Sequence, residues 1–334
     1  MNQPIDFVVL WVDCNDAEWQ KEKQKYSGVK DIDNSVIRYQ DWENLKYWFR
    51  SVEKYAPWVN RVHLVTNGQV PAWLDTECPK LNLVKHSDYM PITALPTFNS
   101  SAIEVGIHAI ANLSEQFVFF NDDLFLTSPI SKKYYFDNGV PVDMAGFISA
   151  PRTNSDNVFS FLMKNNSDVI FSYFNKKEIV INGWRRWFRP WYGKTFFRSL
   201  VYALRKGRVG FVIPHLSTPY TKTDFKRVWE KESDKLIATQ HNRFRAKTDV
   251  THFLFRNWRM CVGDFVSRKS KGKYFSVKNI ADAKKIASAI IENKYPEICI
   301  NEQCSGEIFE EIKKVVNGAF EQKLPQKSIF ERND

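Results

Sequence analysis

The chain has 334 residues, enough for two domains or for one large α/β domain with additions. Its 48 lysine and arginine residues outnumber its 38 aspartate and glutamate residues by ten, which suits nucleic acid, an anionic membrane surface, or phosphorylated and acidic sugars. No stretch approaches the roughly 20 apolar residues of a membrane-spanning helix, and five irregularly spaced cysteines argue against a disulfide framework and a zinc ribbon.

Strands and helices alternate along the first 120 residues. Pro57 ends one predicted helix, and Ser100 or Ser101 can cap the next. This alternation predicts an α/β fold with a largely parallel sheet. Short apolar runs predict strands over 5–12, 61–66, 81–85 and 117–120, and apolar residues at helical spacing predict helices over 41–55 and 100–113.

Asp122 and Asp123 are the most informative residues, because they follow Asn121 at the end of a bulky apolar run. The carboxyl end of a strand is where an α/β sheet usually holds its ligand, and adjacent carboxylates there suit Mg²⁺ or Mn²⁺ bound with a phosphate group. An ordinary turn is the alternative. Asp13 and Asp16 follow the first strand, so a parallel sheet would bring a second acidic loop to the same edge, unless that loop is only a solvated turn.

A loop of small polar residues, with Asn99 and Ser100 at its end, enters the predicted helix at 100. Such a helix N-terminus offers free N–H groups and a positive dipole end to an anion. Glu104, one turn further on, is a candidate general base or metal ligand. Alternatively, it only complements the helix dipole.

The character of the chain changes after about residue 150. We predict an α/β core over 1–150, a basic aromatic helical insertion over 151–210 and a helical C-terminal part over 211–334. Within 184–208, cations interleave with aromatic residues, which favours either an anionic membrane or polyanion-binding face, or a helical subdomain whose cations snorkel over an aromatic core. Further helices are predicted over 224–238, 248–262, 279–292 and 306–322.

Three residues of the C-terminal part have two interpretations each. His215 follows apolar residues and is either a satisfied core histidine or a catalytic imidazole. Arg243 and Arg245 are either a clamp for phosphate oxygens or plain surface cations.

Four blocks of residues, in order along the chain, resemble the Stealth family. Two departures are small: Cys14 stands where the family usually has glycine, and Glu302 replaces a common aspartate. The blocks are 5–16; Arg38 with 45–47, 50–51, 55–59, 65–74, 95–100, 102–104 and 121–123; His215 with 244–245; and 298–301 with 325–331.

The resemblance implies a hexose-1-phosphate transferase of bacterial capsular or cell-surface polysaccharide synthesis. A hydroxyl of an oligosaccharide or polysaccharide acceptor would attack the β-phosphorus of a UDP-hexosamine, and UMP would leave. The implied fold is a Rossmann-like or glycosyltransferase-A-like, largely parallel sheet with helices on both faces and added helical segments. The essential family residues map onto Glu104, Asp122, Asp123, His215 and Arg245, of which Asp122 and Asp123 would hold Mg²⁺ or Mn²⁺. As substrate-binding residues we predict Asp13, Asp16, Arg38, Arg50, Asn99, Ser100 and Arg243.

Two alternatives stay open at this point. A conventional glycosyltransferase would cleave the sugar–oxygen bond and release UDP. A non-catalytic basic module would bind membrane or nucleic acid, but adjacent carboxylates repel a polyanion unless a metal intervenes, so we expect no nucleic-acid partner. The cysteine usage and the absence of a secretory signal lead us to expect the bacterial cytoplasm, with 184–208 as the candidate contact to the inner membrane face.

Overall fold

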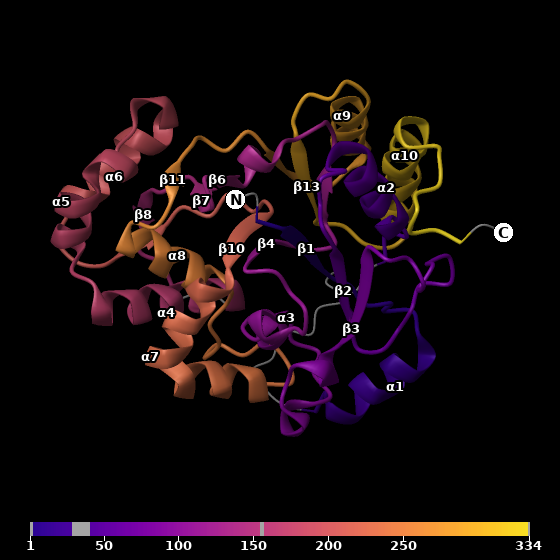
Figure 1. Cartoon of the computed structure of the whole chain (residues 1–334), viewed down its shortest axis with the longest axis horizontal. Coiled ribbons are helices and arrows are strands. Elements are labelled where there is room, and N and C mark those ends of the chain that lie inside the picture. The colour runs from indigo at the N-terminus through magenta and orange to yellow at the C-terminus, as the bar shows by residue number, and fades with distance from the viewer. Residues whose placement is uncertain (1–2, 29–40, 154–156, 333–334) are drawn as a thin grey trace.

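A five-stranded sheet forms the centre of the computed structural model, which describes residues 3–28, 41–153 and 157–332 (Figure 1). The strand order is β10-β4-β1-β2-β3, in which β4, β1, β2 and β3 are parallel and β10 is antiparallel to β4. The four strands predicted in the first 120 residues are confirmed to within two residues. Their bounds are β1 Ile5–Leu10, β2 Val62–Thr66, β3 Leu81–Lys85 and β4 Gln116–Phe120, joined by β10 Thr218–Thr221.

Helices cover both faces of the central sheet, because alternate side chains of its strands enter two different cores. Phe7 and Val9 of β1 pack in one core and Val8 packs in the other. The predicted α/β class, with a largely parallel sheet between helices, is confirmed (Figure 1). The first core is covered by α2 (Leu45–Tyr55), α9 (Ile280–Ile291) and α10 (Glu307–Lys323), and the second by α3 (Ser100–Glu104), α7 (Lys222–His241) and α8 (Phe253–Val262).

The winding of the sheet reverses between β1 and β4. The chain passes outward from β1 to β2 and β3, then returns to the other side of β1 to form β4. In doubly wound sheets, ligands bind outside the carboxyl ends of the strands at such a switch point. The residues that follow Leu10 and Phe120 therefore lie where the topology alone predicts a ligand.

A second sheet begins almost where β4 ends. β5 (Leu124–Leu126) is antiparallel to β13 (Glu297–Glu302), which is parallel to β12 (Lys273–Val277). Only Asn121, Asp122 and Asp123 separate the last residue of β4 from the first residue of β5. This three-residue link, the β4–β5 link, holds the two carboxylates between two sheets.

The remaining described elements surround these sheets. Among the described residues, no helix combines the length and apolar character needed to cross a membrane. The smaller strands are β6 (Phe136–Asp137), β7 (Val140–Asp143), β8 (Phe147–Ser149), β9 (Val209–Phe211) and β11 (Val266–Ser267), and the other helices are α1 (Ala17–Tyr26), α4 (Val158–Tyr173), α5 (Lys176–Trp187) and α6 (Lys194–Leu204).

The predicted helix over 100–113 is wrong beyond Glu104, where α3 ends and only a 3₁₀ turn follows. Gly106 explains the break. A β-carbon at this position would lie 2.7 Å from the side-chain amide of Gln240 and 3.4 Å from the ring of Tyr89. The close approach of α7 therefore overrides the helical pattern of the sequence.

A buried ion-pair network fixes α8 beside the sheet. Asp143 at the end of β7 contacts Arg256 at 2.6 Å and Arg259 at 3.0 Å, and Arg259 also contacts Asp224 of α7 at 2.9 Å. Burial alone would raise the pKa of Asp143, but the two arginines bring it below its ordinary value. Because α8 begins directly after His252, this network also holds one side of the candidate site.

Arg50, predicted from sequence to bind substrate, instead joins α2 to the C-terminal segment. Its Nε and Nη2 each donate to the Glu331 carboxylate at 2.8 Å, and its Nη1 donates to the carbonyl of Leu324 at 2.8 Å. Arg50 is 8% exposed and does not line the cavity described below. A guanidinium whose donors are all engaged in this way stabilises the fold and is not available to bind a ligand.

Replacement of Arg50 by methionine is expected to lower the free energy of unfolding by about 3 kcal/mol, because the buried Glu331 carboxylate would lose its cationic partner and keep only Ser328 as a hydrogen-bond donor. Urea denaturation followed by tryptophan fluorescence measures this change. Lys54→Met in the same helix is the matched control, since Lys54 is exposed, and its effect should stay within about 0.5 kcal/mol. Wild-type stability of Arg50→Met together with lost ligand affinity would restore the substrate-binding role.

Candidate active site

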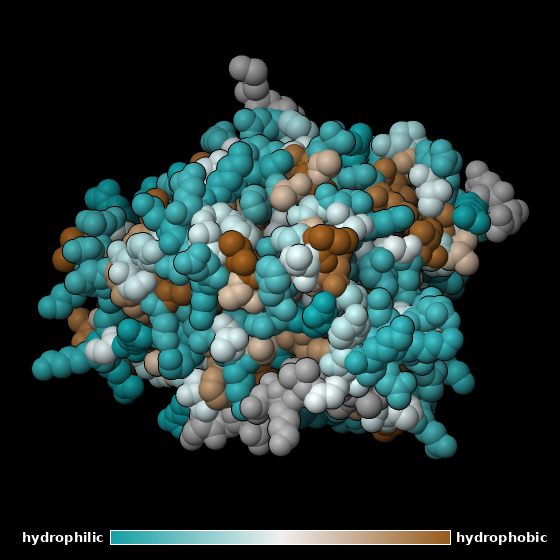
Figure 2. Space-filling view, turned by 90° about the horizontal axis from the view of Figure 1, so that it is seen from below, coloured by the Kyte–Doolittle hydropathy of each residue, from teal (hydrophilic) through white to brown (hydrophobic). Residues whose placement is uncertain are grey.

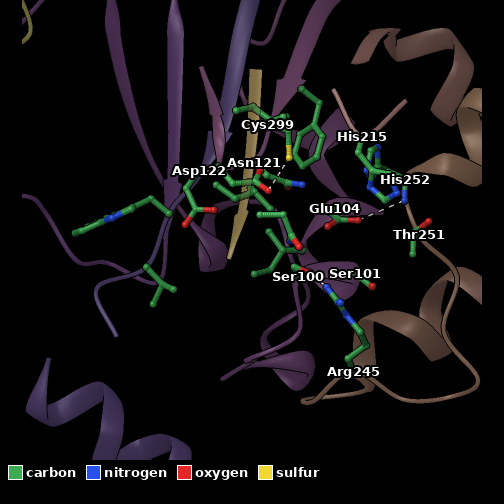
Figure 3. Close-up of a pocket in the computed structure, with 18 of the residues that line it drawn as sticks. Ser100, Ser101, Glu104, Asn121, Asp122, His215, Arg245, Thr251, His252 and Cys299 are labelled. Carbon is green, nitrogen blue, oxygen red and sulfur yellow. Dashed lines mark hydrogen bonds between the residues drawn. The ribbon is translucent and has the colours of Figure 1, made fainter. Parts of the chain in front are cut away.

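A cavity of about 610 Å³ opens at the carboxyl ends of β1 and β4 (Figure 3). Several separate parts of the fold contribute to it, among them α3, the β4–β5 link, the segment before β10 and the segment before α8. Ser100 lines it as well. All five residues that the sequence marked as catalytic line this one cavity: Glu104, Asp122, Asp123, His215 and Arg245.

The carboxylate pair is held by the second sheet. The carbonyl of Asp123 accepts a hydrogen bond from the N–H of Ile300 at 2.9 Å, and its Oδ2 accepts one from Cys299 Sγ at 3.2 Å. Desolvation inside the cavity raises the pKa of Asp122 to about 8, with added repulsion from Asp123 and Glu302. Desolvation likewise raises the pKa of Asp123 to about 6. The pair is therefore strained electrostatically as long as nothing positive faces it.

One oxygen of the pair is in the environment expected of a cation ligand. Oδ1 of Asp123 is shielded from solvent and has no hydrogen-bond partner in the described part of the chain. An unpaired carboxylate oxygen is costly, and a cation would satisfy it. The described residues form no group of three or more His, Cys, Asp and Glu side chains suited to a metal. Two carboxylates alone suit Mg²⁺, which usually takes its other ligands from water and substrate phosphates.

In the view of Figure 3, Glu104 lies between Asp122 and His252. It is 5% exposed, and its Oε2 accepts the N–H of His252 at 3.5 Å. Burial raises the pKa of Glu104, while the charge of Arg245 and hydrogen bonds from His252 and Ser100 act in the opposite direction. Glu104 is thus a carboxylate whose charge depends on Arg245 for compensation.

Arg245 is positioned by a loop that α3 itself holds. Its guanidinium donates to the hydroxyl of Ser100, the first residue of α3. Asn99, the residue before, donates from Nδ2 to the carbonyl of Asn242 at 2.9 Å and to Asp249 Oδ2 at 2.8 Å. Asn99 is fully buried and does not line the cavity. The structure therefore makes Asn99 a support for the Arg245 loop rather than a ligand contact.

In Figure 3, His215 lies next to His252, on the side of Glu104 that faces away from Asp122. Its backbone has φ +51°, a left-handed conformation that is uncommon for a residue with a β-carbon and clusters at functional sites. Its imidazole lies 5.3 Å from the ring of Tyr274 and 5.7 Å from that of Phe159, and this environment lowers its pKa by desolvation. His215 faces the cavity, contrary to the core-histidine interpretation.

Four other residues predicted to bind substrate do not line the cavity or cannot be placed. Asp16 caps α1 through its side chain, and Asp13 accepts a backbone N–H in the turn after β1. Arg243 donates to a carbonyl of the neighbouring loop at 3.2 Å. None of these three lines the cavity. Arg38 lies outside the described residues.

Several cavity residues escaped the sequence prediction. Three tryptophans line the cavity: Trp11, Trp19 and Trp42. His252 lies against Glu104, and Cys299 donates to Asp123. Tryptophans occur throughout this chain, His252 stands in no motif, and the family block over 298–301 does not single out Cys299. Only their positions in the fold distinguish these residues.

Comparisons with known proteins agree on one family. The family model described as Stealth protein CR1, conserved region 1, matches residues 3–30, and Stealth protein CR2, conserved region 2, matches residues 38–143. A capsular polysaccharide phosphotransferase WcwK of Streptococcus pneumoniae is 39% identical, with 99% of this chain and 98% of the relative covered. A receptor polysaccharide phosphotransferase WefC of Streptococcus oralis is 40% identical, with 98% and 99% covered. The exopolysaccharide phosphotransferase cps2G of Lactiplantibacillus plantarum is 39% identical, with 98% and 96% covered.

Removal of one charge from the carboxylate pair is expected to stabilise the metal-free protein at alkaline pH. A carboxyl whose pKa is higher in the folded than in the unfolded state costs stability once ionised, so the cost is absent near pH 4 and grows towards pH 8. Asp122→Asn should raise the free energy of unfolding by about 0.5–1 kcal/mol at pH 8, a value reduced by solvent screening, and change nothing at pH 4. Urea denaturation at both pH values tests this, with exposed Asp234→Asn of α7 as the control.

Divalent cations should bind this pair and raise the melting temperature of the wild type. Because the ligand carboxylates must be ionised, Mg²⁺ or Mn²⁺ should raise it more at pH 8 than at pH 6. Differential scanning fluorimetry of the Asp122→Asn, Asp123→Asn double variant supplies the decisive comparison. The same cation-dependent shift in that variant would locate the ion elsewhere.

Proposed function

The chain belongs to the Stealth family, and on that premise we propose that it transfers hexosamine-1-phosphate from a UDP-sugar to a hydroxyl of an acceptor glycan. UMP is released, and a phosphodiester forms in a bacterial capsular or cell-surface polysaccharide. We place this reaction in the bacterial cytoplasm, with a nucleotide sugar as its donor. The relatives' names, capsular and exopolysaccharide phosphotransferase, support the transfer of a phosphorylated group.

One observation carries this proposal: a single cavity contains two adjacent carboxylates, an arginine and two groups able to accept a proton. A nucleotide diphosphate needs positive charge on its oxygens, and Arg245 supplies it. A hydroxyl nucleophile needs a proton acceptor, and His215 and Glu104 are both within the same cavity. Transfer of a phosphoryl group to a hydroxyl uses all three kinds of group.

The donor fits the cavity in one orientation better than in the reverse. Trp11 lines the cavity just beyond the end of β1, near where a nucleotide commonly binds in a doubly wound sheet, and Trp19 and Trp42 line the same cavity. The diphosphate would then lie between the carboxylate pair and Arg245. The acceptor would enter beside His215 and Tyr274, whose rings offer a face for a sugar.

The transfer breaks one P–O bond and the O–H bond of the acceptor, whose proton passes to the base. The acceptor oxygen attacks the β-phosphorus, the bond from that phosphorus to the bridging oxygen breaks, and the electron pair leaves with UMP. The bond between the anomeric carbon and its oxygen stays intact, so the anomeric configuration is retained. Arg245 stabilises the equatorial oxygens, since phosphoryl transfer depends mainly on positioning and charge.

Asp122 and Asp123 would hold Mg²⁺ or Mn²⁺ in this site. When bound, the ion neutralises charge on the diphosphate and makes UMP a better leaving group. Because the two carboxylates lie at the end of β4, they would hold the ion there and so keep the donor diphosphate close to the acceptor hydroxyl.

His215 is the better candidate for the proton acceptor. Desolvation lowers its pKa, so the imidazole is neutral at pH 7 and free to take a proton. Glu104 is already engaged by Arg245, Ser100 and His252. Its role is therefore to hold Arg245 in place and to balance its charge.

The released nucleotide distinguishes this reaction from that of a conventional glycosyltransferase. With UDP-GlcNAc, UDP-GalNAc or UDP-ManNAc and candidate acceptors, the wild type should release UMP, and phosphorus NMR of the product should show a phosphodiester. Asp123→Asn should lose activity by about 10²-fold or more, as for removal of a group that stabilises transferring phosphate. Asp234→Asn is the matched control. Release of UDP would establish the conventional glycosyltransferase instead.

Substitution of His215 by alanine is expected to lower kcat by roughly 10²–10⁴-fold. At Mg²⁺ concentrations that saturate the wild type at every pH, kcat/KM should rise with pH through a value below the ordinary histidine pKa of about 6.5, because the base must be neutral. This acidic limb should vanish in His215→Ala and persist in the exposed control His241→Ala. If His215→Ala keeps both turnover and the limb while Glu104→Gln loses them, Glu104 is the base.

A further inference from the structure

Nearly all the excess positive charge of the chain lies in one segment. Residues 176–208 contain ten lysines and arginines against one acid, Glu178, a surplus of nine where the whole chain has a surplus of ten. The rest of the protein is therefore close to neutral. This segment forms α5, a 3₁₀ turn over Pro190–Tyr192 and α6. A charge concentrated in this way marks a binding face rather than general solubility.

Helix α6 exposes its large apolar side chains and buries its small polar ones. Ser199 is fully buried, and its Oγ accepts the N–H of Phe147 in β8 at 3.0 Å. Gly146 meets the same face, since a β-carbon there would lie 2.7 Å from Thr195 and 2.9 Å from Ser199. The opposite face carries an apolar stripe at helical spacing, exposed by 68% at Phe197, 42% at Leu200, 50% at Val201 and 80% at Leu204.

α5 and its following turn extend this apolar surface. Ile181 is 70% exposed, Trp184 56% and Trp191 51%, whereas Trp187 and Tyr192 are buried and anchor the segment. α5 and α6 lie together at one end of the molecule, away from the central sheet (Figure 1). At that end, hydrophobic residues reach the surface among hydrophilic ones (Figure 2). Within 184–208, therefore, some aromatic residues are buried and others face outward.

We propose that the α5–α6 hairpin is a peripheral docking surface for a lipid bilayer that contains anionic headgroups. Such a surface combines an exposed apolar stripe with tryptophan and flanking lysine and arginine side chains. Arg189 lies 4.8 Å from the ring of Trp191 and Arg185 lies 5.9 Å from that of Trp184, so cations and interfacial aromatics are already paired. The apolar stripe would enter the headgroup region while the cations contact lipid phosphates.

Lipid is favoured over a soluble polyanion by the aliphatic residues. A polyanion would use the cations, but it offers nothing to bury Leu204 or Val201, which remain exposed to water at a cost. A bilayer satisfies both kinds of group. A second copy of this chain would bring two surfaces of the same strong positive charge together, which opposes self-association through this face.

Docking would also orient the cavity relative to the bilayer. α4 contributes Phe159 and Leu162 to the cavity lining and leads directly into α5. The hairpin and the cavity wall are therefore consecutive parts of the chain. This inference goes beyond the proposed reaction and does not depend on it, because it concerns binding alone.

Sedimentation of the full chain with extruded vesicles tests the proposal. The wild type should bind phosphatidylcholine vesicles that contain roughly 30% phosphatidylglycerol. It should bind vesicles of pure phosphatidylcholine about tenfold more weakly. The double variant Phe197→Ser, Leu204→Ser should lose about tenfold or more in partitioning. The double variant Arg198→Glu, Arg205→Glu should lose at least as much on anionic vesicles, and added salt should weaken wild-type binding.

Matched controls exist on other faces of the molecule. Ile92→Ser removes an equally exposed apolar side chain, and the pair Lys284→Glu, Lys314→Glu reverses two exposed charges on α9 and α10; both should bind vesicles like the wild type. Circular dichroism melting confirms that each variant is folded. UMP release with a water-soluble acceptor should be unchanged in the hairpin variants, which separates failure of docking from failure of the proposed reaction.

Three results would overturn the proposal. The first is a wild type that sediments with neither kind of vesicle. The second is binding to heparin, used as a soluble polyanion, that matches vesicle binding and falls only with the charge reversals, which would make the hairpin a polyanion-binding face. The third is a dimer in analytical ultracentrifugation that Phe197→Ser, Leu204→Ser converts to a monomer, which would make the stripe a contact between copies.

Discussion

The candidate site depends on one constraint: β4 leaves the central sheet and enters a second sheet after only three residues. The N–H of Ile300 fixes the backbone of Asp123, and one oxygen of its carboxylate has no partner in the described structure. Desolvation and the neighbouring acids raise the pKa values of Asp122 and Asp123, so ionising both carboxyls costs free energy unless a cation joins them. Arg245 compensates a different carboxylate of the cavity, that of Glu104.

The residues that hold the site together are different from those that face its contents. The side chains of Asn99 and Asp249 are hydrogen-bonded to each other and hold the loop that carries Arg245. Asn99 is nevertheless fully buried and does not line the cavity. Asp143 and its two arginines hold α8 and, with it, the segment around His252. Preorganisation of this kind moves the cost of clustering charges into the folding free energy, so that little reorganisation is needed when a substrate arrives.

The sequence was informative wherever the governing physics is local. β4 could be predicted because a strand covered on both faces needs consecutive apolar residues, and Asp122 was suspicious because it breaks such a run. The break after Glu104 could not be predicted, since it arises from the contact of Gly106 with Gln240 on a distant helix. The role of Arg50 was equally hidden, because its partner lies 281 residues away. The resemblance to a family identified site residues, but it did not separate those that touch the cavity from those behind it.

The pairing of Arg50 with Glu331 also constrains how the protein folds. The apolar face of α2 packs on Phe320 and Phe330, with ring centroids 5.7 Å apart for Tyr47 and Phe320. Arg50 and Glu331 are 281 residues apart, so this part of the α2 surface is covered only by contacts of very long sequence separation. Contacts of that kind form slowly, because a long loop must close first, so we expect this side of the first core to assemble late in folding.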